Sequence, residues 1–286
     1  MAKKVLVIGA AGLLGSYIMD ARFNLPDVDF LGTHYIQPCP GTVKLELEKK
    51  DTIQKIVDQF HPDIVYVSGY MTNVDRCERE GNARRINVGG IKNLLEVVGQ
   101  NVKVVFISSS YVFDGSKNDP YDIWDIPMPI QQYGIQKLLA ENIVLSGGPE
   151  NMVVRTCGIV GNETARKNFA YQVFDKLGRG EEFKAYSDQL LAPIHAESLA
   201  NSMVEMVRDG VCGLVHINGN EIVTKYEFAY DIASNLLGYD YARKIKPTTA
   251  GESPQPALRP YNACLKNTTF IPTSYEEMLG KLYAIK

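Results

Sequence analysis

The chain of 286 residues lacks long hydrophobic runs: no apolar stretch approaches the roughly 20 residues that a membrane-spanning helix needs. Its start resembles a signal peptide, because Lys3 and Lys4 precede an apolar run, but Gly9 and Gly12 interrupt that run after a few residues. This pattern predicts a buried strand that enters a turn. We therefore expect no membrane segment.

The sequence also lacks an excess of basic residues. Its 30 Lys and Arg against 33 Asp and Glu give a formal charge of -3 and a pI of ≈ 5.9, which argues against a nucleic-acid partner. The 5 cysteines form no Cys-x-x-Cys pair, and no histidine lies at a spacing to Cys, Asp or Glu that predicts a metal site. Because the cysteines are scattered and odd in number, we expect a cytoplasmic protein without a bound metal.

Short β-branched runs alternate along the chain with longer segments of helical spacing. The runs are Val5–Ile8, Ile64–Val67, Val102–Ile107 and Met152–Val154. The helical candidates are Leu13–Phe23, Thr52–Phe60, Asn82–Gly99, Gln132–Leu145 and Asn168–Leu177. This alternation predicts an α/β fold, a Rossmann-type doubly wound parallel sheet with helices on both faces.

A glycine-rich loop joins the first predicted strand to the first predicted helix. Gly9, Gly12 and Gly15 follow a Gly-x-x-Gly-x-x-Gly pattern, one residue different from the commonest dinucleotide fingerprint. Gly9 permits a tight turn, Gly12 lets the backbone approach a pyrophosphate, and Gly15 lets the helix pack closely on the strand. The helix N-terminus adds unpaired N–H groups. A purely structural turn is the alternative, but the strand before it and the helix after it favour binding of NAD or NADP.

The pattern becomes looser after about Gly158. A helix at Ala196–Arg208, a strand at Leu214–Ile217 and a helix at Lys225–Leu237 precede a proline-rich stretch from Pro247 to Pro260. We therefore expect residues 1–158 to form an NAD(P)-binding Rossmann domain, with some later segments returning to it. Residues 159–286 are expected to form mainly a smaller substrate-binding region, with the ligand at the carboxyl ends of the strands.

The end of the second expected strand bears on the choice between NAD and NADP. Gly32-Thr33-His34-Tyr35 contains no acidic residue that would bond a ribose 2′-hydroxyl and repel a 2′-phosphate. NADP(H) is therefore favoured, while NAD(H) stays open because no Arg lies there to bind the phosphate. Thr33 and His34 are the candidate contacts.

Tyr133 and Lys137 open a predicted helix at i, i+4 spacing, which places the phenol and the ammonium on one face. We expect the ammonium to lower the pKa of the phenol from its usual value near 10, so that Tyr133 serves as an acid-base catalyst. Ser109 follows the strand Val102–Ile107, where it would polarise a substrate carbonyl as hydride arrives from the nicotinamide. A surface helix pair is the alternative interpretation.

Together these residues resemble the extended short-chain dehydrogenase/reductase superfamily and, within it, the dTDP-4-dehydrorhamnose reductase family. The resemblance runs almost end to end, and its specific signals are Thr72-Asn73-Val74-Asp75 and Tyr111-Val112-Phe113-Asp114-Gly115. Further matches in the family's order are Pro62-Asp63-Ile64-Val65, Ile86-Asn87-Val88, Glu141, Arg155-Thr156, Asp188-Gln189, Pro193 and Arg259-Pro260.

The resemblance implies an oxidoreductase of dTDP-rhamnose biosynthesis, which uses NAD(P)H to reduce the 4-keto group of a nucleotide-diphospho-deoxysugar. Ser109, Tyr133 and Lys137 take the family's catalytic positions, and Asn87 is expected to brace the strand ends. The implied cofactor contacts are Gly9, Gly12, Leu13, Leu14, Gly69, Tyr70, Met71, Tyr133 and Lys137. The implied substrate contacts are Thr72, Val74, Ser110, Gly158 and Arg259.

Four departures from the family pattern affect the expected sugar pocket. Ser110 stands in place of an aspartate, Met71 of a tyrosine, Gly158 of a tryptophan and Ile194 of a threonine. Loss of an acceptor and of an aromatic wall changes which hydroxyls a pocket accepts, so the sugar is left open.

Two further residues have competing interpretations. Arg259 precedes Pro260 in a rigid loop and is expected either to bind a diphosphate or to form a surface salt bridge. His195 is expected either to face a ligand or, as we favour, to be an ordinary, partly buried histidine at a helix start.

Two other functions remain open. An epimerase or dehydratase of the same superfamily would call for an added acid or base beside the catalytic hydroxyl, where Ser110 stands. A cofactor-binding regulatory subunit is the second alternative, because the beta subunit of methionine adenosyltransferase is similar to this family and can retain the three catalytic residues. The oligomeric state also stays open, with a homodimer as one candidate.

Overall fold

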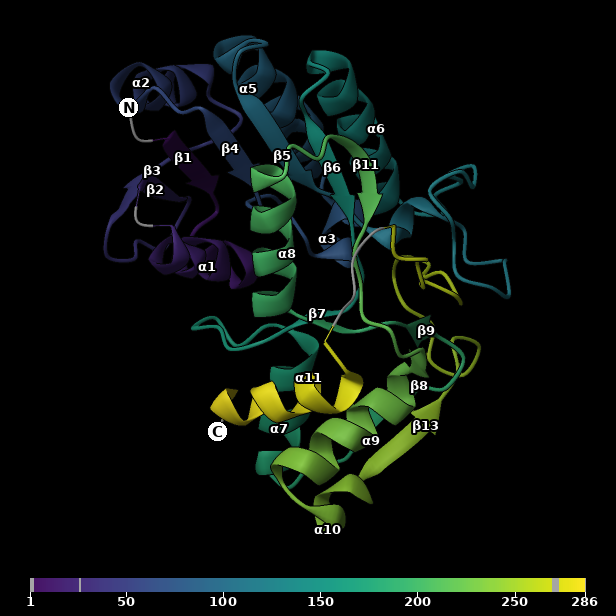
Figure 1. Cartoon of the computed structure of the whole chain (residues 1–286). Helices are drawn as coiled ribbons and strands as arrows, with labels where there is room; N and C mark the ends of the chain where they lie inside the picture. Colours follow the sequence, from purple (N-terminus) through teal and green to yellow (C-terminus); the bar gives the residue numbers. More distant parts are fainter. Residues whose placement is uncertain (1–2, 26, 269–272, 286) are drawn as a thin grey trace.

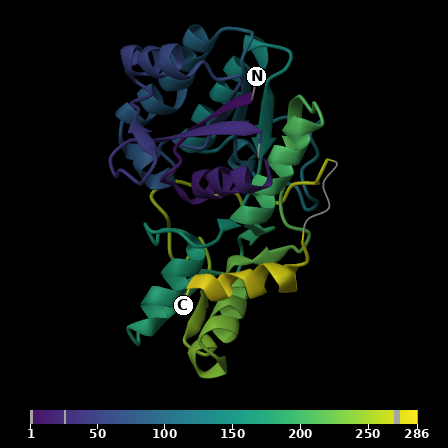
Figure 2. The ribbon, with the colours of Figure 1, turned by 60° about the vertical axis from the view of Figure 1, so that its left-hand side comes forward.

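The computed structural model describes residues 3–25, 27–268 and 273–285. Within them the chain forms an upper lobe, built on a seven-stranded sheet, and a smaller lower lobe (Figure 1). The N-terminus lies in the upper lobe and the C-terminus in the lower lobe, as Figure 2 shows from another side.

The seven strands of the upper sheet pair in parallel, in the order β11-β6-β5-β4-β1-β2-β3. They are β1 (Lys3–Ile8), β2 (Val28–His34), β3 (Thr42–Lys44), β4 (Ile64–Val67), β5 (Lys103–Ile107), β6 (Met152–Arg155) and β11 (Gly213–His216). From β1 the chain moves outward to β2 and β3, and then it crosses to β4 on the other side of β1. The carboxyl ends of β1 and β4 therefore meet at the switch point where open α/β sheets bind ligands.

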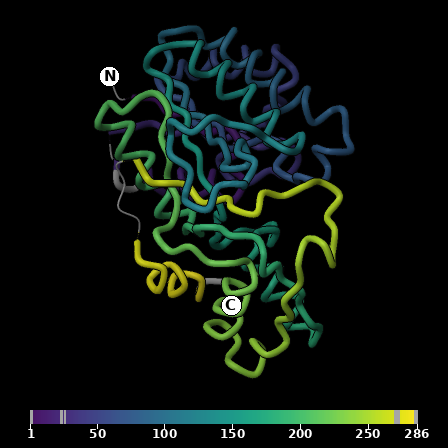
Figure 3. The backbone as a smooth tube through the Cα atoms, turned by 90° about the vertical axis from the view of Figure 1, so that its right-hand side faces the viewer, coloured from purple at the N-terminus to yellow at the C-terminus, as the bar shows by residue number. Residues whose placement is uncertain are grey.

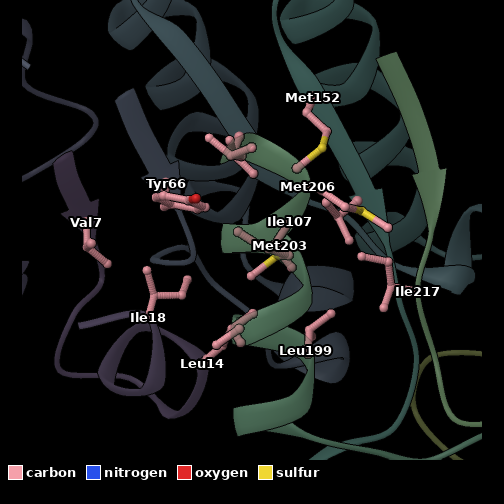
Figure 4. Close-up of a cluster of buried hydrophobic side chains, with 14 of the residues drawn as sticks. Val7, Leu14, Ile18, Tyr66, Ile107, Met152, Leu199, Met203, Met206 and Ile217 are labelled. Atoms are coloured by element: carbon pink, nitrogen blue, oxygen red, sulfur yellow. The ribbon is translucent and has the colours of Figure 1, made fainter. Parts of the chain in front are cut away.

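Helices cover both faces of this sheet (Figure 1). Those on one face are α2 (Lys50–Phe60), α5 (Gly90–Val98) and α6 (Gln132–Gly147), and those on the other are α1 (Leu13–Asp20) and α8 (Ala196–Arg208). Figure 4 shows the second interface, where Ile18, Leu199 and Met203 are fully buried beneath the strands. Because helices cover both faces, β4 is buried along its whole length and reads Ile-Val-Tyr-Val.

The lower lobe packs its helices around a second hydrophobic core. They are α7 (Phe169–Gly178), α9 (Lys225–Leu236), α10 (Tyr239–Ala242), α11 (Tyr275–Lys281) and the 3-10 turn η4 (Leu282–Ile285). Short strands pair two by two: β7 (Ile159–Val160) with β10 (Ile194–His195), β8 (Phe183–Tyr186) with β13 (Ile245–Thr248), and β9 (Leu190–Leu191) with β12 (Val223–Thr224). Phe228 stacks on Phe169 with 5.6 Å between the ring centroids and anchors α9 in this core.

Residues 249–268, which we call the return segment, lead from β13 back across the boundary between the lobes (Figure 3). In the lower lobe, the backbone N–H of Leu190 donates to the carbonyl of Tyr261 at 2.6 Å. In the upper lobe, Leu265 forms a parallel bridge with Tyr121, and the N–H of Thr268 donates to the carbonyl of His216 at 3.2 Å. The return segment thus ties the two lobes together at several points.

The predicted α/β class and doubly wound parallel sheet are confirmed, and every predicted strand and helix is present with slightly shifted ends. Two helices are less regular than predicted. The first ends at Asp20 and continues as the 3-10 turn η1 (Ala21–Asn24), and the helix expected at 82–99 consists of α4 (Asn82–Arg84), the π turn η2 (Arg85–Gly89) and α5. The strands of two to four residues in the lower lobe, and β3, were not predicted because such lengths show no periodicity.

Two segments beyond residue 158 belong to the upper lobe: α8 covers one face of the large sheet, and β11 extends its edge beside β6. The assignment of cofactor binding to residues 1–158 and substrate binding mainly to 159–286 stays a prediction. Across the described part of the chain, the helices are too short or too polar to cross a membrane. The five cysteines are free thiols.

We expect Leu199→Ala to lower the free energy of unfolding by about 2–5 kcal/mol, because the side chain is fully buried between α8 and the sheet and its removal leaves a cavity. Leu145→Ala, on the more exposed surface of α6, is the control and should change it by less than about 1 kcal/mol. Urea denaturation of both variants measures the difference. Equal losses would mean that α8 does not pack on the sheet as described.

Candidate active site

The glycine loop holds the carboxyl ends of β1 and β4 against each other. Gly9 has a φ of +86°, and a Cβ there would lie 2.4 Å from the Cα of Gly69, which follows β4. A Cβ at Gly15 would lie 2.1 Å from the carbonyl oxygen of Gly9. Gly12 is the N-cap of α1, so the free N–H groups of the helix begin beside this narrow turn. The loop therefore leaves a backbone cradle that any larger side chain would fill.

The two leucines after Gly12 differ in exposure. Leu13 is half-buried, whereas the side chain of Leu14 lies in the core between α1 and the sheet. A ligand at the helix start would therefore meet the backbone N–H of Leu14 rather than its side chain.

Thr33 and His34 at the end of β2 have separate positions. Thr33 is 1% exposed, its hydroxyl accepts a hydrogen bond from the N–H of Gly9 at 3.3 Å, and its carbonyl accepts one from Ala10 at 2.8 Å. Thr33 is thus placed to hold the glycine loop from below. His34 is half-buried, with its Nδ1 2.7 Å from the hydroxyl of Thr42, and lies nearer the surface.

Ser109, Tyr133 and Lys137 converge at the carboxyl end of β5. Ser109 caps the 3-10 turn η3 (Ser110–Val112), and its hydroxyl interacts with the phenol of Tyr133. Tyr133 and Lys137 lie one turn apart at the start of α6, with the Lys137 Nζ 5.7 Å from the Tyr133 ring centroid. The predicted trio is therefore brought together, while its catalytic role stays a prediction.

Lys137 is fixed beneath the site by the end of β5. Its Nζ donates to the carbonyl of Ile107 at 2.7 Å and lies 2.9 Å from the centroid of the Tyr70 ring. The hydroxyl of Tyr70 donates to the same carbonyl at 2.6 Å. The ammonium is therefore held by one carbonyl and one aromatic face, with its side chain 1% exposed.

The electrostatics of this trio differ from the prediction. Burial raises the pKa of Tyr133 above the usual value, and the interaction with Ser109 opposes only part of that rise. Burial likewise lowers the pKa of Lys137 well below its usual value, and the carboxylate of Glu141 opposes this. The predicted fall in the pKa of the phenol is thus wrong in sign, because desolvation dominates the shift. The phenol stays protonated at neutral pH, as a proton donor must be.

Residues after β4 form the wall beside Tyr133. Met71 and Val74 pack around it, and Tyr111, which follows β5, adds its ring with 6.2 Å between the centroids of Tyr111 and Tyr133. Thr72, the neighbouring substrate candidate, is exposed.

Asn87, in the π turn η2, holds this wall. Its side chain accepts from the N–H of Met71 at 2.9 Å, donates to the carbonyl of Met71 at 3.0 Å and donates to Gln136 of α6 at 2.8 Å. The prediction that Asn87 braces the strand ends is confirmed by these contacts.

Arg259 of the return segment reaches across to α3 (Val74–Arg79). Its Nη1 lies 2.8 Å from a carboxylate oxygen of Asp75, which also accepts from the backbone N–H of Ala257 at 3.2 Å. The Arg259 side chain is 9% exposed, so the salt bridge is more buried than expected. The pair fastens the return segment beside the wall formed by Met71 and Val74.

Two predicted substrate contacts lie in restricted places. The Ser110 hydroxyl is buried and has no hydrogen-bond partner among the described residues. Gly158 has a φ of +60°, and a Cβ there would lie 2.9 Å from Leu191 and 3.1 Å from the Cα of Pro193. An aromatic side chain at position 158 would therefore require a different backbone. Ile194 is buried in the main core, so its replacement of a threonine affects packing directly.

Sequence reasoning assigned no role to a buried network behind the trio. Arg155 donates to both carboxylate oxygens of Glu141, at 2.9 and 2.7 Å, and the two side chains are 3% and 2% exposed. The hydroxyl of Ser108 donates to the same carboxylate. The available signal was the spacing of Lys137 and Glu141, which places them one turn apart on α6.

His195 is buried more completely than predicted, at 3% exposure, where it caps the start of α8. Its Nδ1 accepts from the N–H of Glu197 at 3.3 Å, and its ring packs edge-on against Tyr17. Burial lowers the pKa of His195 to about 4. Within the described ranges, no group of three His, Cys, Asp or Glu side chains is placed to hold a metal ion.

Comparisons with known proteins agree with this geometry. The family model of the RmlD substrate binding domain matches residues 3–279. The probable low-salt glycan biosynthesis reductase Agl14 of Haloferax volcanii is 28% identical over 267 residues, 91% of this chain and 88% of that protein. The methionine adenosyltransferase 2 subunit beta of Rattus norvegicus is 30% identical over 277 residues, 92% of this chain and 80% of that protein.

A solved structure is similar over its full length. The crystal structure of dTDP-4-dehydrorhamnose reductase from Bacillus anthracis in complex with NADP superposes with a TM-score of 0.87 at 25% identity, covering 100% of both chains.

We expect Gly9→Ala to lower the free energy of unfolding by at least about 2 kcal/mol, because alanine is strained at this φ and its Cβ would collide with Gly69. Gly81→Ala is the matched control: its φ is -61°, nothing lies within 4 Å, and the change should stay within about 0.5 kcal/mol. Thermal and urea unfolding measure both. A Gly9→Ala protein as stable as the control would contradict the described contact between the loops.

We expect the protein to lose stability as the pH falls from about 6.5 to 4. The pKa of His195 is about 4 when folded and near 6.5 when unfolded, so the unfolded state binds the proton first. His195→Asn keeps a capping side chain and removes this titration, which should reduce the loss by about 3 kcal/mol. Urea unfolding of both proteins at several pH values measures it. Parallel curves would show that His195 titrates normally.

Proposed function

The chain belongs to the RmlD substrate binding domain family, and from this membership and the geometry of its site we propose that it is an NAD(P)H-dependent reductase of a nucleotide-diphospho-4-keto-deoxysugar. The observation that carries the proposal is the convergence of Ser109, Tyr133 and Lys137 beside the glycine loop, with a phenol that stays protonated at neutral pH. Reduction of a ketone needs one hydride and one proton, and this site provides a proton donor.

Each residue of the trio has a distinct part in the proposed reaction. When bound, the reduced nicotinamide supplies the hydride that adds to the carbonyl carbon. Tyr133 donates its proton to the carbonyl oxygen as negative charge develops there, and the Ser109 hydroxyl donates a hydrogen bond to the same oxygen. The Lys137 ammonium stabilises the phenolate left behind, and it is held in place by the carbonyl of Ile107. A proton from solvent then restores the phenol.

The residues around the glycine loop fit a dinucleotide. The backbone cradle at Gly9, Gly12 and Gly15 suits a pyrophosphate, which the free N–H groups at the start of α1 would bind. We favour NADP(H), since β2 ends without an acidic residue and His34 lies near the surface there. The similar reductase from Bacillus anthracis was crystallised with NADP. NAD(H) remains the second candidate.

The proposed substrate lies between the wall after β4 and the return segment. Thr72 and Val74 would contact the sugar, and Met71 would contact the cofactor beside them. Arg259, which pairs with Asp75 of α3, would bind a diphosphate. A separate hollow of ≈ 440 Å³ lies against another part of the return segment. Its lining residues are Gly115, Ser116, Lys117, Asn118, Ser187, Asp188, Leu190, Tyr261 and Asn262. Gly158 and Ser110 stay candidate substrate contacts, although their surroundings restrict them.

A cofactor-binding regulatory subunit is the second candidate function. It is favoured by one observation, the 30% identity to the methionine adenosyltransferase 2 subunit beta over 92% of this chain. The epimerase or dehydratase alternative gains less support, because the residue beside Ser109 is Ser110, whose hydroxyl is buried and is not an acid. A cytoplasmic location fits the free thiols and the nicotinamide chemistry. A homodimer stays a prediction.

The purified protein should oxidise NADPH in the presence of dTDP-4-keto-6-deoxy-L-mannose, and Tyr133→Phe should lower kcat by about 10²–10⁴-fold while cofactor binding is retained. Tyr241→Phe, which changes a half-exposed tyrosine outside the site, is the matched control and should keep full activity. Absorbance at 340 nm measures turnover, and fluorescence titration measures NADPH and NADH binding.

The outcomes separate the candidates. Unchanged turnover in Tyr133→Phe would contradict the proposed mechanism. Tight NADPH binding without turnover of any nucleotide-linked keto sugar would favour the regulatory subunit.

A further inference from the structure

Three polar side chains form a buried network beneath the site, between β5, β6 and α6, and His216 of β11 borders it with its Nε2 3.5 Å from the Nη1 of Arg155. Arg155 binds both carboxylate oxygens of Glu141, and the hydroxyl of Ser108 donates to one of them. All three side chains are nearly inaccessible to solvent. The network is therefore a complete ion pair inside the protein rather than a surface bridge.

Stability does not account for such a network. Removing two charges from water is costly, and apolar side chains of similar volume often stabilise a core equally well or better. Leu, Met and Val fill the neighbouring core positions of this sheet. The charges at Glu141 and Arg155 therefore call for an explanation in the site itself.

Lys137 provides that explanation, because it is a buried cation one helical turn before Glu141. The groups that face it come from three elements and one loop: Tyr133 and Glu141 from α6, the Phe106 ring and the Ile107 carbonyl from β5, Cys77 from α3, and Tyr70 from the loop after β4. Burial raises the pKa of Cys77, which keeps that thiol neutral. Glu141 is thus the carboxyl side chain in this set, and Arg155 holds it in place.

Ser108 connects the same carboxylate to the catalytic hydroxyl. It follows β5 directly, and its side chain points down to Glu141 while the next residue, Ser109, interacts with Tyr133. Neighbouring residues of extended backbone point to opposite sides, so fixing Ser108 also fixes the direction of Ser109. One carboxylate therefore acts electrostatically on Lys137, one helical turn away, and holds Ser108, the neighbour of Ser109.

We propose that Glu141 is a positioning residue, held by Arg155, which keeps Lys137 as an ammonium and orients Ser109 through Ser108. This inference rests on the proposed reductase function. A buried lysine without a counter-charge loses its proton at a lower pH. If Glu141 were neutral, the site would lose the ammonium that stabilises the phenolate, although no residue that touches the substrate would have changed.

The test compares Glu141→Gln, which removes the charge with little change in shape, with Glu141→Asp, which keeps it. In Glu141→Gln the basic limb of the kcat–pH profile should move at least about one pH unit lower, with kcat at pH 8 reduced about tenfold or more. Glu141→Asp should keep the limb within about 0.3 pH units of the wild type. Glu96→Gln removes one partner of an exposed ion pair with Lys50 and is the matched control.

A second variant separates positioning from folding. Ser108→Ala/Glu141→Met/Arg155→Met replaces the whole network by apolar side chains, which should fold. Its basic limb should move to lower pH as in Glu141→Gln, because Lys137 again lacks its counter-charge. If the network were merely structural, the basic limb of the kcat–pH profile of this variant would lie at the same pH as in the wild type.

Unfolding by urea without substrate gives a readout independent of turnover. Because the pKa of Lys137 is lower in the folded than in the unfolded protein, stability rises with pH between those two values. In Glu141→Gln this rise should begin about one pH unit lower. A wild type that shows this rise but turns over no keto sugar would contradict the reductase function alone. An unmoved limb in either folded variant, or failure of both to fold, would overturn the role of Glu141.

Discussion

Charge buried at the carboxyl end of the sheet is the constraint on which this site depends. Lys137, Glu141 and Arg155 are each 1–3% exposed, and all lie where β5 and β6 end beneath α6. In such surroundings an unpaired charge costs several kcal/mol, so each group needs a partner that is fixed in space. The partners are the Ile107 carbonyl and the Tyr70 ring for Lys137, and the bidentate pair between Arg155 and Glu141. Burial and pairing together hold the catalytic candidates rigidly.

The same burial sets the protonation states that the chemistry needs. A phenol excluded from water keeps its proton, and therefore Tyr133 is available as an acid at neutral pH. A lysine excluded from water tends to lose its proton, and a carboxylate nearby counteracts that tendency. Desolvation thus favours the neutral form of both side chains, which suits Tyr133 as a proton donor but not Lys137 as an ammonium. The carboxylate of Glu141 opposes this effect at Lys137.

The two lobes are joined beside this buried network mainly by hydrogen bonds of loop segments. The return segment lies across the boundary by backbone hydrogen bonds to Leu190, Tyr121 and His216, and Arg259 fastens it to Asp75. The wall after β4 is braced separately by Asn87. The substrate region is therefore assembled from loops, which hydrogen bonds position over a scaffold built by hydrophobic packing.

The amino-acid sequence by itself determined the sheet, its covering helices and the glycine loop. The spacing of apolar residues indicates which side of a helix or strand is buried, and Gly9, Gly12 and Gly15 indicate a tight backbone turn. Both features depend on residues that are close in sequence, so the sequence is enough to predict them. Tertiary structure alone decided the short strands of the lower lobe, the bracing by Asn87, the Asp75–Arg259 pair and the Glu141 network. The folded environment also raises the pKa of Tyr133, which the sequence had led us to expect to fall. The reason is physical: a pKa and an ion pair depend on solvent access and on partners distant in sequence, which exist only once the chain has folded.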